Sequence, residues 1–281
     1  MLLEGLGFPE ALRWRDGALW FSDMFRSRVV RWVPGSAAET VLDAASGGPT
    51  VPGGLGWLPD GSLLVVDCER RRVLRLRDGA VSVHADLTEL MTHSANDMHV
   101  DADGTAWVGG YGFDPEHDEP VPSPLVRVDA DGVASATASA FVFPNGCERN
   151  ATGALLVAET FADRVSSMSL DGEVTLGAQF ERGAGPDGLS IAPDGTLYVA
   201  LAFAGALARV GSGPDARPEL VHRAEPIASG PGAGPLGVYD CAVHPHVRRI
   251  AVAMASLDEA LAERVDTGRI VLLDLPLPAL P

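Results

Sequence analysis

The chain repeats one pattern of apolar and polar residues along most of its length. Each copy has an apolar stretch, a tight turn, an alternating apolar strand, a short loop and a further strand that starts near Arg-Val. In the second copy these parts are Gly54 to Trp57, Asp60-Gly61, Ser62 to Val66 and Arg72 to Leu76. Asp-Gly between alternating apolar runs is a strong hairpin signal, because a type I′ turn needs positive φ angles. The pattern therefore predicts repeated antiparallel hairpins.

The spacing of these turns indicates the architecture. Five turn glycines recur at intervals of 42 to 49 residues, and a degenerate sixth copy follows near Ala242-Val243. They are Gly17, Gly61, Gly104, Gly153 and Gly195. A period of about 40–50 residues with four short strands per unit is typical of β-propellers. We therefore expect an all-β fold, a six-bladed β-propeller with four antiparallel strands per blade, in which residues 1–281 form a single domain.

The two ends of the chain are expected to meet in the sixth blade. Its third strand, Arg269 to Leu273, is followed by a Pro-rich tail, so a fourth strand is missing from the C-terminal side. A blade buries both faces only when its neighbours stack against it and the ring closes. We expect the N-terminal segment Leu2 to Gly5 to supply this strand and close the ring.

Charge narrows the range of partners. The formal net charge is -17, and all 21 basic residues are Arg. Such an acidic chain should repel nucleic acid and anionic lipid, so we expect neither nucleic acid nor a membrane as a partner. The absence of Lys also excludes a Schiff-base lysine and a P-loop lysine in this chain. The expected partner is a small-molecule substrate, and the expected state is a monomer or a small homo-oligomer.

The sequence favours a reducing compartment. Met1 to Phe8 lacks the basic and long apolar regions of a signal peptide. No stretch approaches the ~20 apolar residues of a membrane span. The three cysteines are far apart and odd in number, which is typical of free thiols. A cytoplasmic location is expected.

Polar residues recur where the innermost strand of each blade should begin. Asn96, Asn145 and Asp187 each lie eight residues before a turn glycine, and Glu10 lies seven before Gly17. In the second blade this position is Gly53, and in the sixth it is Asp240 or Tyr239. Such residues can be ordinary turn residues. Their recurrence at one offset favours a ring of oxygen ligands for a hard cation such as Ca²⁺.

At these residues the chain resembles the SMP-30/gluconolactonase/LRE-like family. The motifs that carry the resemblance are Phe8-Pro9-Glu10, Asn96-Asp97, Phe143-Pro144-Asn145-Gly146 and Pro186-Asp187-Gly188-Leu189. The resemblance implies that Glu10, Asn145 and Asp187 bind one divalent cation, with Asn96 beside it. Ca²⁺ is the expected ion, and Zn²⁺, Mg²⁺ and Mn²⁺ are the alternatives. It also implies that Asp187 is the general base.

The expected function is hydrolysis of small lactones or related esters. Metal-polarised carbonyl chemistry with Asp187 as the base agrees with this expectation. Two alternatives stay open: another reaction at the same metal, such as phosphotriester hydrolysis or a specialised reaction of secondary metabolism, and a non-enzymatic binding propeller stabilised by the metal.

The walls of the site should set its specificity. Sugar-lactonase members often carry an Arg two residues before the Asn of the third blade, where this chain has Ser94, preceded by His93. Two long connections, Tyr111 to Pro124 and Met254 to Gly268, are expected to lie on the metal face as lids. We predict that Asn96, His93, Ser94, Tyr111 and Phe161 contact the substrate. Phe25, Arg26 and Phe203 are expected on shorter loops of the same face.

Other candidate groups are weaker. His244-Pro245-His246 resembles a metal-binding pair, but its position indicates a turn on the opposite face. Cys147 and Cys241 are expected to pack between blades, because no base that would activate either thiol is evident.

Overall fold

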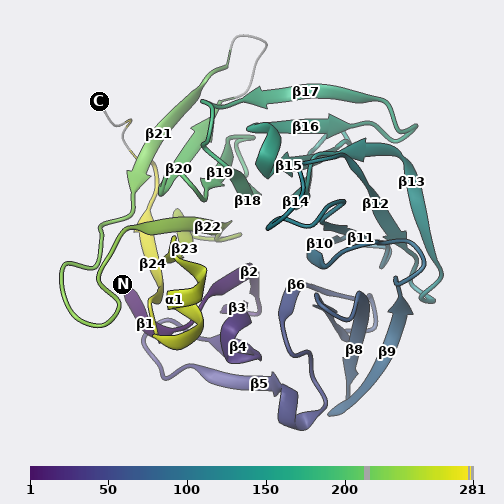
Figure 1. The fold of residues 1–281 in the computed structure, drawn as a ribbon, viewed down its shortest axis with the longest axis horizontal. Coiled ribbons are helices and arrows are strands. Elements are labelled where there is room, and N and C mark those ends of the chain that lie inside the picture. The colour runs from purple at the N-terminus through teal and green to yellow at the C-terminus, as the bar shows by residue number, and fades with distance from the viewer. Residues whose placement is uncertain (212–215, 278, 280–281) are drawn as a thin grey trace.

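The computed structural model describes residues 1–211, 216–277 and 279. Six four-stranded antiparallel sheets stand around a common centre, as Figure 1 shows. Each inner strand lies near that centre and each fourth strand lies at the periphery (Figure 1). The prediction of a six-bladed β-propeller with four strands per blade is confirmed.

The first three blades run from the inner strand outward in chain order. Blade 1 comprises β2 (Pro9–Arg15), β3 (Ala18–Asp23), β4 (Arg28–Trp32) and β5 (Glu39–Asp43). Blade 2 comprises β6 (Pro52–Trp57), β7 (Leu63–Asp67), β8 (Arg72–Arg77) and β9 (Ala80–Asp86). Blade 3 comprises β10 (Ala95–Val100), β11 (Ala106–Gly110), β12 (Ser123–Val128) and β13 (Ala134–Phe141).

The next two blades follow the same order, and four short helices complete the described elements. Blade 4 comprises β14 (Pro144–Arg149), β15 (Leu155–Glu159), β16 (Arg164–Met168) and β17 (Val174–Gln179). Blade 5 comprises β18 (Pro186–Ile191), β19 (Leu197–Leu201), β20 (Ala206–Val210) and β21 (Pro218–Arg223). The helices are η1 (Met24–Arg26), η2 (Ala44–Ser46), η3 (Thr160–Ala162) and α1 (Glu259–Arg264).

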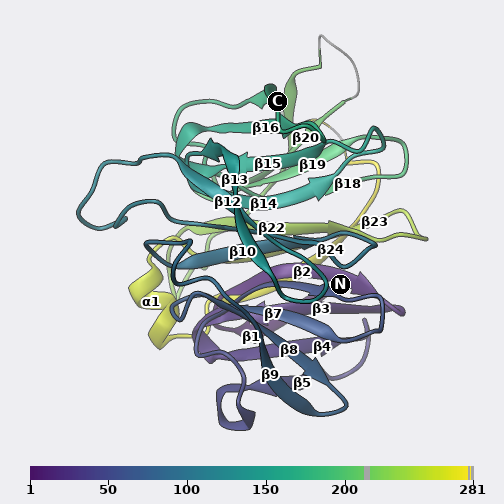
Figure 2. The same ribbon diagram turned by 90° about the vertical axis from the view of Figure 1, so that its right-hand side faces the viewer.

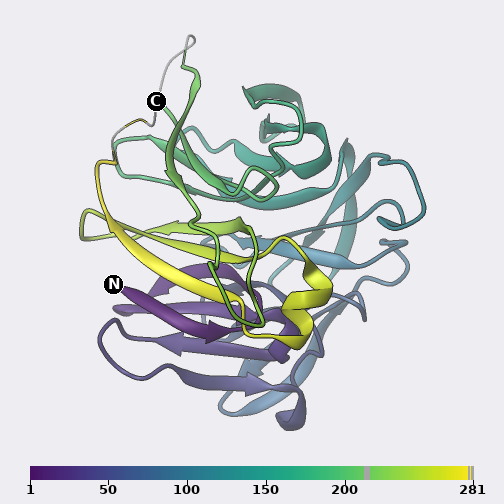
Figure 3. The same cartoon turned by 60° about the vertical axis from the view of Figure 1, so that its left-hand side comes forward.

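Blade 6 closes the ring with strands from both ends of the chain. Its order is β22 (Leu236–Val243), β23 (Arg249–Ser256), β24 (Gly268–Asp274) and β1 (Leu2–Leu6). In the β1–β24 pair, Leu2 lies opposite Val271 and Leu3 opposite Ile270. Figure 3 shows β1 beside β24 at the front of the molecule. The predicted closure by the N-terminal segment is confirmed.

The core lies between neighbouring blades. One cluster joins blades 2 and 3 through fully buried Val66, Val73, Val108 and Val126. A second joins blades 6 and 1 through Leu19 and Phe21 with Ala251 and Ile270. Because each sheet has a neighbour on both faces, second strands such as β7 and β19 read as nearly continuous apolar runs.

The strand register defines the two faces of the ring. Pro9 at the start of β2 pairs with Asp23 at the end of β3, so inner strands begin where the second-to-third strand connections lie. We call this end of the central channel the mouth. The connection 111–122 and helix α1 both project on this side (Figure 2). Among the described helices, none is long and apolar enough to cross a membrane.

Candidate metal centre

Each inner strand carries an irregularity near its start. The pairing register shifts between Glu10 and Arg13 in β2, and equivalent shifts occur in the other five inner strands. A bulge bends the strand and can redirect a side chain. The backbone conformation is unusual there as well, because Ala11 and Phe143, neither of which is a glycine, adopt a positive φ of 53°. The backbone is thus held in a costly conformation beside Glu10 and Asn145.

Hydrogen bonds orient the amide of Asn145. Asn145 is buried, and its Nδ2 donates to Thr160 Oγ1 at 3.3 Å. Its Oδ1 accepts from Nδ2 of Asn96 at 2.8 Å. An amide oxygen has two lone pairs, so one stays available for a further partner. The structure therefore brings Asn96 and Asn145 together. Thr160, which fixes the amide, is a residue that the sequence pattern does not indicate.

The carboxylates of Glu10 and Asp187 are both repelled by the same neighbouring negative charges. Burial, followed by repulsion from Asp187, Asp240 and Asp97, raises the pKa of Glu10. Burial, followed by repulsion from Asp240, Asp97 and Glu259, raises the pKa of Asp187. Both shifts are those of carboxylates gathered without a compensating positive charge.

Asp187 carries an acceptor atom without a partner. Its Oδ1 is buried and makes no hydrogen bond within the described part of the chain. A buried carboxylate oxygen without a partner is costly, and its repulsion of a second buried carboxylate, Glu10, indicates a place for a positive group. Carboxylate and amide oxygens are the ligands that hard divalent cations prefer. Glu10, Asn145 and Asp187 therefore fit such an ion.

A set of three protein ligands for the ion must include the amide oxygen of Asn145. Within the described ranges, no three His, Cys, Asp or Glu side chains come together as a metal site. Two carboxylates and one amide would leave several positions of a six- to eight-coordinate ion open to water or substrate.

Steric contact explains why blade 2 offers no ligand. A Cβ on Gly53 would lie 2.5 Å from Cys68 Sγ and would also meet the carbonyl of Asn96. Glycine is required after Asn145 and after Asp187 for the same steric reason. A Cβ on Gly146 would lie 2.6 Å from the carbonyl oxygen of Asp187, and one on Gly188 would lie 2.5 Å from Cγ of Asp240. These glycines lie inside strands where inner strands approach closely, so they are not residues of reverse turns.

A buried ion network lies in the channel beneath this centre. Nη2 of Arg13 donates to Asp97 at 3.1 Å, and its Nη1 lies 3.7 Å from Asp240. The backbone N–H of Leu12 and that of Cys241 also donate to Asp240. Asp240 is therefore turned toward blade 1 and the floor of the centre. The sequence offset places Asp240 near the mouth but does not indicate its pairing with Arg13.

Two acidic residues at the ends of second strands hold the backbone that leads into the candidate ligands. Oδ1 of Asp23 accepts the N–H groups of Gly7 and Phe8 at 2.9 and 3.0 Å. Oε2 of Glu159 accepts the N–H of Val142 at 2.8 Å. Each acid also pairs with the Arg five residues later, Arg28 or Arg164. An acid followed five residues later by Arg, at a strand end, is a signal that the sequence does contain.

The predicted substrate-contacting residues come from blades 3 and 4 and from the connection between blades 2 and 3. Tyr111 N–H donates to the carbonyl of Ser94 at 3.0 Å. His93, Ser94 and Tyr111 line one 350 Å³ cavity between blades 2 and 3. Phe161 lies on η3, directly after Thr160. Asn96 is the member of the set that touches a candidate ligand directly.

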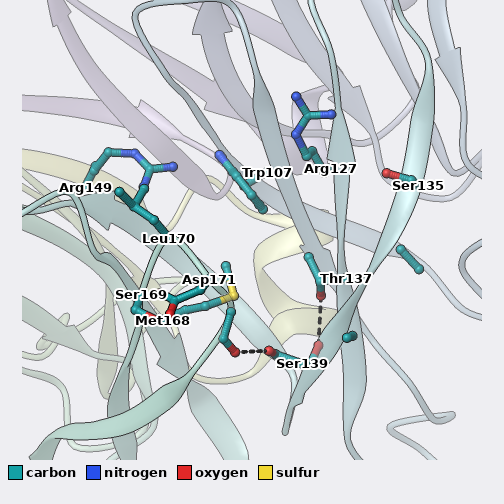
Figure 4. Close-up of a pocket in the computed structure, with 13 residues that line it drawn as sticks. Trp107, Arg127, Ser135, Thr137, Ser139, Arg149, Met168, Ser169, Leu170 and Asp171 are labelled. Atoms are coloured by element: carbon teal, nitrogen blue, oxygen red, sulfur yellow. Dashed lines mark hydrogen bonds between the residues drawn. The ribbon is translucent and has the colours of Figure 1, made fainter.

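Other cavities and reactive groups lie away from this centre. The cavity of 320 Å³ in Figure 4 lies between blades 3 and 4 and includes the β16–β17 turn, on the face opposite the mouth. His244 and His246 belong to the β22–β23 turn on that opposite face, as expected. All three cysteines are free and buried. Burial is the first cause that raises the pKa of Cys241, which leaves its thiol inert.

Solved structures share this architecture. A luciferin-regenerating enzyme is 17% identical, with a TM-score of 0.76, over 100% of this chain and 97% of the other. A gluconolactonase from Xanthomonas campestris is 18% identical, with a TM-score of 0.71, over 99% and 89%. Regucalcin from Agrobacterium tumefaciens, a calcium-binding protein, is 15% identical, with a TM-score of 0.70, over 98% and 94%. These identities show a common fold.

Sequence comparison places the chain in a family. No curated protein matches it by sequence. The family model described as SMP-30/Gluconolactonase/LRE-like region matches residues 8–216, a span that contains Glu10, Asn96, Asn145 and Asp187. The motifs, the propeller and this match agree, and the chain belongs to the SMP-30/gluconolactonase/LRE-like family.

Proposed function

We propose that the protein is a divalent-cation-dependent hydrolase of small lactones or related esters, with Ca²⁺ as the ion. The observation that carries the proposal is the buried Oδ1 of Asp187, which has no partner among the described residues. The negative charge of Asp187 repels that of Glu10, and the oriented amide of Asn145 lies nearby. Two carboxylates whose charges oppose one another need a cation to coexist in ionised form. A gluconolactonase and a calcium-binding regucalcin among the structural relatives support the same proposal.

The side chains of the centre have different proposed roles. Glu10, Asn145 and Asp187 would hold the ion. When bound, the ion supplies a Lewis acid that polarises the carbonyl and stabilises the charge that develops on its oxygen. The carboxylate of Asp187 would accept a proton from the attacking water. Asn96 orients Asn145, and Tyr111 and Phe161 border the space for the substrate.

A combined metal and activity measurement tests the proposal. Protein purified without chelator should contain about one divalent ion per chain, and added Ca²⁺ should raise its melting temperature. Asp187→Asn should remove that thermal shift and lower kcat/KM for a lactone panel by about 100-fold or more. The matched control is Asp171→Asn, an exposed aspartate in a turn on the opposite face.

Three outcomes separate the candidate functions. Bound metal with lactone or ester turnover supports the proposal. Bound metal with turnover of a phosphotriester alone would favour the alternative reaction. Bound metal without turnover of any of these substrates would favour a binding propeller. Full activity in Asp187→Asn would remove Asp187 from its proposed role.

A further inference from the structure

Most of the Phe and Tyr residues of the chain gather at the mouth. The sequence has nine Phe and three Tyr. Eight of these twelve lie at inner-strand starts, in second-to-third strand connections, or in contact with residues there. They are Phe8, Phe25, Tyr111, Phe113, Phe143, Phe161, Phe203 and Tyr239. These eight aromatic residues come from every blade except the second. Together they form a surface that we call the aromatic wall.

The rings touch in two groups. Tyr111 stacks on Phe143 with ring centroids 3.8 Å apart, and Phe161 contacts Phe113 at 5.4 Å and Phe203 at 5.8 Å. This group extends across blades 3, 4 and 5. In the second group, Phe8 contacts Phe25 at 4.9 Å and Tyr239 at 4.3 Å, which joins blades 1 and 6.

The aromatic wall is built onto the candidate metal centre. Phe8 and Phe143 each precede a candidate ligand by two residues, in Phe8-Pro9-Glu10 and Phe143-Pro144-Asn145. The position two before Asp187 is Gly185, and a Cβ there would lie 2.5 Å from the ring of Phe203. Phe203 therefore occupies the place that an aromatic side chain takes in the other two motifs. The rings of Phe8, Phe143 and Phe203 therefore lie beside the segments that lead into the candidate ligands.

Part of the wall is uncovered. Phe113 and Phe143 are buried, but Phe161 is 37% exposed and Phe203 is 46% exposed. Exposed neighbouring rings at the mouth of a site are unsatisfied apolar surface that a ligand can cover. An aromatic ligand would gain ring contacts in addition to buried area.

The charges at the mouth disfavour an anionic ligand. Arg28 and Arg164 are paired with Asp23 and Glu159. Arg26 pairs with Asp266 and donates to the end of α1. Nη1 of Arg71 donates to the carbonyls of Met91 and Thr92, so Arg71 keeps its positive charge beside the cavity of His93 and Ser94. A divalent ion would offset Glu10 and Asp187, and Arg13 offsets one of its two acidic partners. An excess of negative charge would then stay beneath the mouth.

Helix α1 adds one more acidic group. Burial raises the pKa of Tyr111 and of Tyr239, and in both cases the next cause is the charge of Glu259. Glu259 is therefore close enough to act on two rings of the wall and on Asp187. A carboxylate or phosphate on the substrate would be repelled by the like charge of Glu259.

We propose that the substrate class of this centre is an uncharged lactone or ester that carries an aromatic ring, which Phe161 and Phe203 contact. This inference rests on the proposed function and extends it to specificity. Phosphorylated or carboxylated lactones are disfavoured because of the excess of acidic groups at the centre, and hydroxylated sugar lactones because Phe161 and Phe203 present apolar surface to the substrate. Phe161 and Phe203 are specificity-determining residues.

Binding of unreactive lactams tests the inference independently of catalysis. Three probes are titrated calorimetrically into the Ca²⁺-loaded protein: dihydrocarbostyril, which has a benzene ring fused to its lactam, aliphatic valerolactam, and a carboxylated dihydrocarbostyril. Dihydrocarbostyril should bind about tenfold tighter than the other two. In Phe161→Ala and Phe203→Ala, its advantage over valerolactam should fall to about threefold or less. Leu170→Ala, at an exposed apolar site on the opposite face, should keep the full advantage.

Hydrolysis of dihydrocoumarin and valerolactone is measured in parallel. If neither lactone is hydrolysed but the binding preference and its loss are observed, the proposed function fails and the binding class stands. If the lactones are hydrolysed but the uncharged lactams bind equally, or both Phe variants keep the full preference, this inference is overturned and the proposed function stands. Tight binding of the carboxylated probe would overturn the charge part of the inference.

Discussion

Asp23 is expected to support the candidate metal centre without contacting the ion. It is fully buried and accepts four hydrogen bonds. Two come from Gly7 and Phe8, and two come from Nε and Nη2 of Arg28 at 3.0 and 2.7 Å. The perturbation is Asp23→Asn, which keeps the shape of the side chain. Its single amide oxygen can serve only one of the two donor pairs well, and its NH₂ then faces the other pair.

The size of the effect follows from these contacts. Breaking a buried ion pair by changing one partner costs about 3–5 kcal/mol. Arg28 is about one-third exposed and can be rehydrated, so we expect the lower value, about 3 kcal/mol. For a chain of this size, that loss corresponds to a fall of about 6–9 °C in melting temperature.

Asp67 provides a matched control. It is also fully buried at the end of a second strand, and it pairs with Arg72 at 2.9 Å. However, its Oδ1 has no partner within the described residues, and its blade carries Gly53 in place of a ligand. Asp67→Asn should therefore destabilise the fold less than Asp23→Asn and leave the affinity for Ca²⁺ unchanged.

Thermal melts and calorimetric Ca²⁺ titration of both variants test this reasoning. Asp23→Asn should weaken Ca²⁺ binding by about tenfold, because the backbone that leads into Glu10 is no longer held. Equal losses of melting temperature and equal Ca²⁺ affinities in the two variants would refute the role of Asp23 as a positioning residue.

Four further predictions follow from the structure. Because burial and neighbouring carboxylates raise the pKa of Glu10 and Asp187, Ca²⁺ titrations from about pH 8 to about pH 5 should show weakening affinity as protons compete. In the metal-free protein, the contribution of these two carboxylates to stability should show the opposite trend: it is fully present below the unfolded carboxylate pKa of about 4 and is lost as pH rises through the raised folded values, and a metal-free Asp187→Asn variant with the same melting profile as the wild type would contradict this. Gly188→Ala should cost about 3 kcal/mol or more in urea unfolding, because its Cβ would overlap Asp240, whereas Gly211→Ala has open space and should cost less than about 1 kcal/mol. Arg26→Ala should speed hydrogen exchange across 257–267, since Arg26 bonds to Glu263, Ala262 and Asp266, and Arg31→Ala on the neighbouring strand should leave that exchange unchanged.

The sequence by itself determined the blades, their number and the closure of the ring. Alternation with a period of two and the Asp-Gly turns are local properties, so each hairpin is visible in a short window. The sixth blade lacks a fourth strand after Arg269 to Leu273. The apolar N-terminal segment is the remaining strand that can complete it. Offsets of seven or eight residues from turn glycines also placed Glu10, Asn96, Asn145 and Asp187 at one end of the channel, because a repeated blade places equivalent residues equivalently.

Only the tertiary structure decided which partners these residues have. The contact of Thr160 with Asn145, the pairing of Arg13 with Asp97 and the glycine at position 53 all depend on how neighbouring blades approach, and no local pattern records that distance. The aromatic wall is the clearest case, because its rings come from five blades. Phe161 and Phe203 lie 42 residues apart in the chain, yet their rings are 5.8 Å apart once the ring of blades closes. Specificity of this kind arises from convergence in space, which sequence periodicity cannot express.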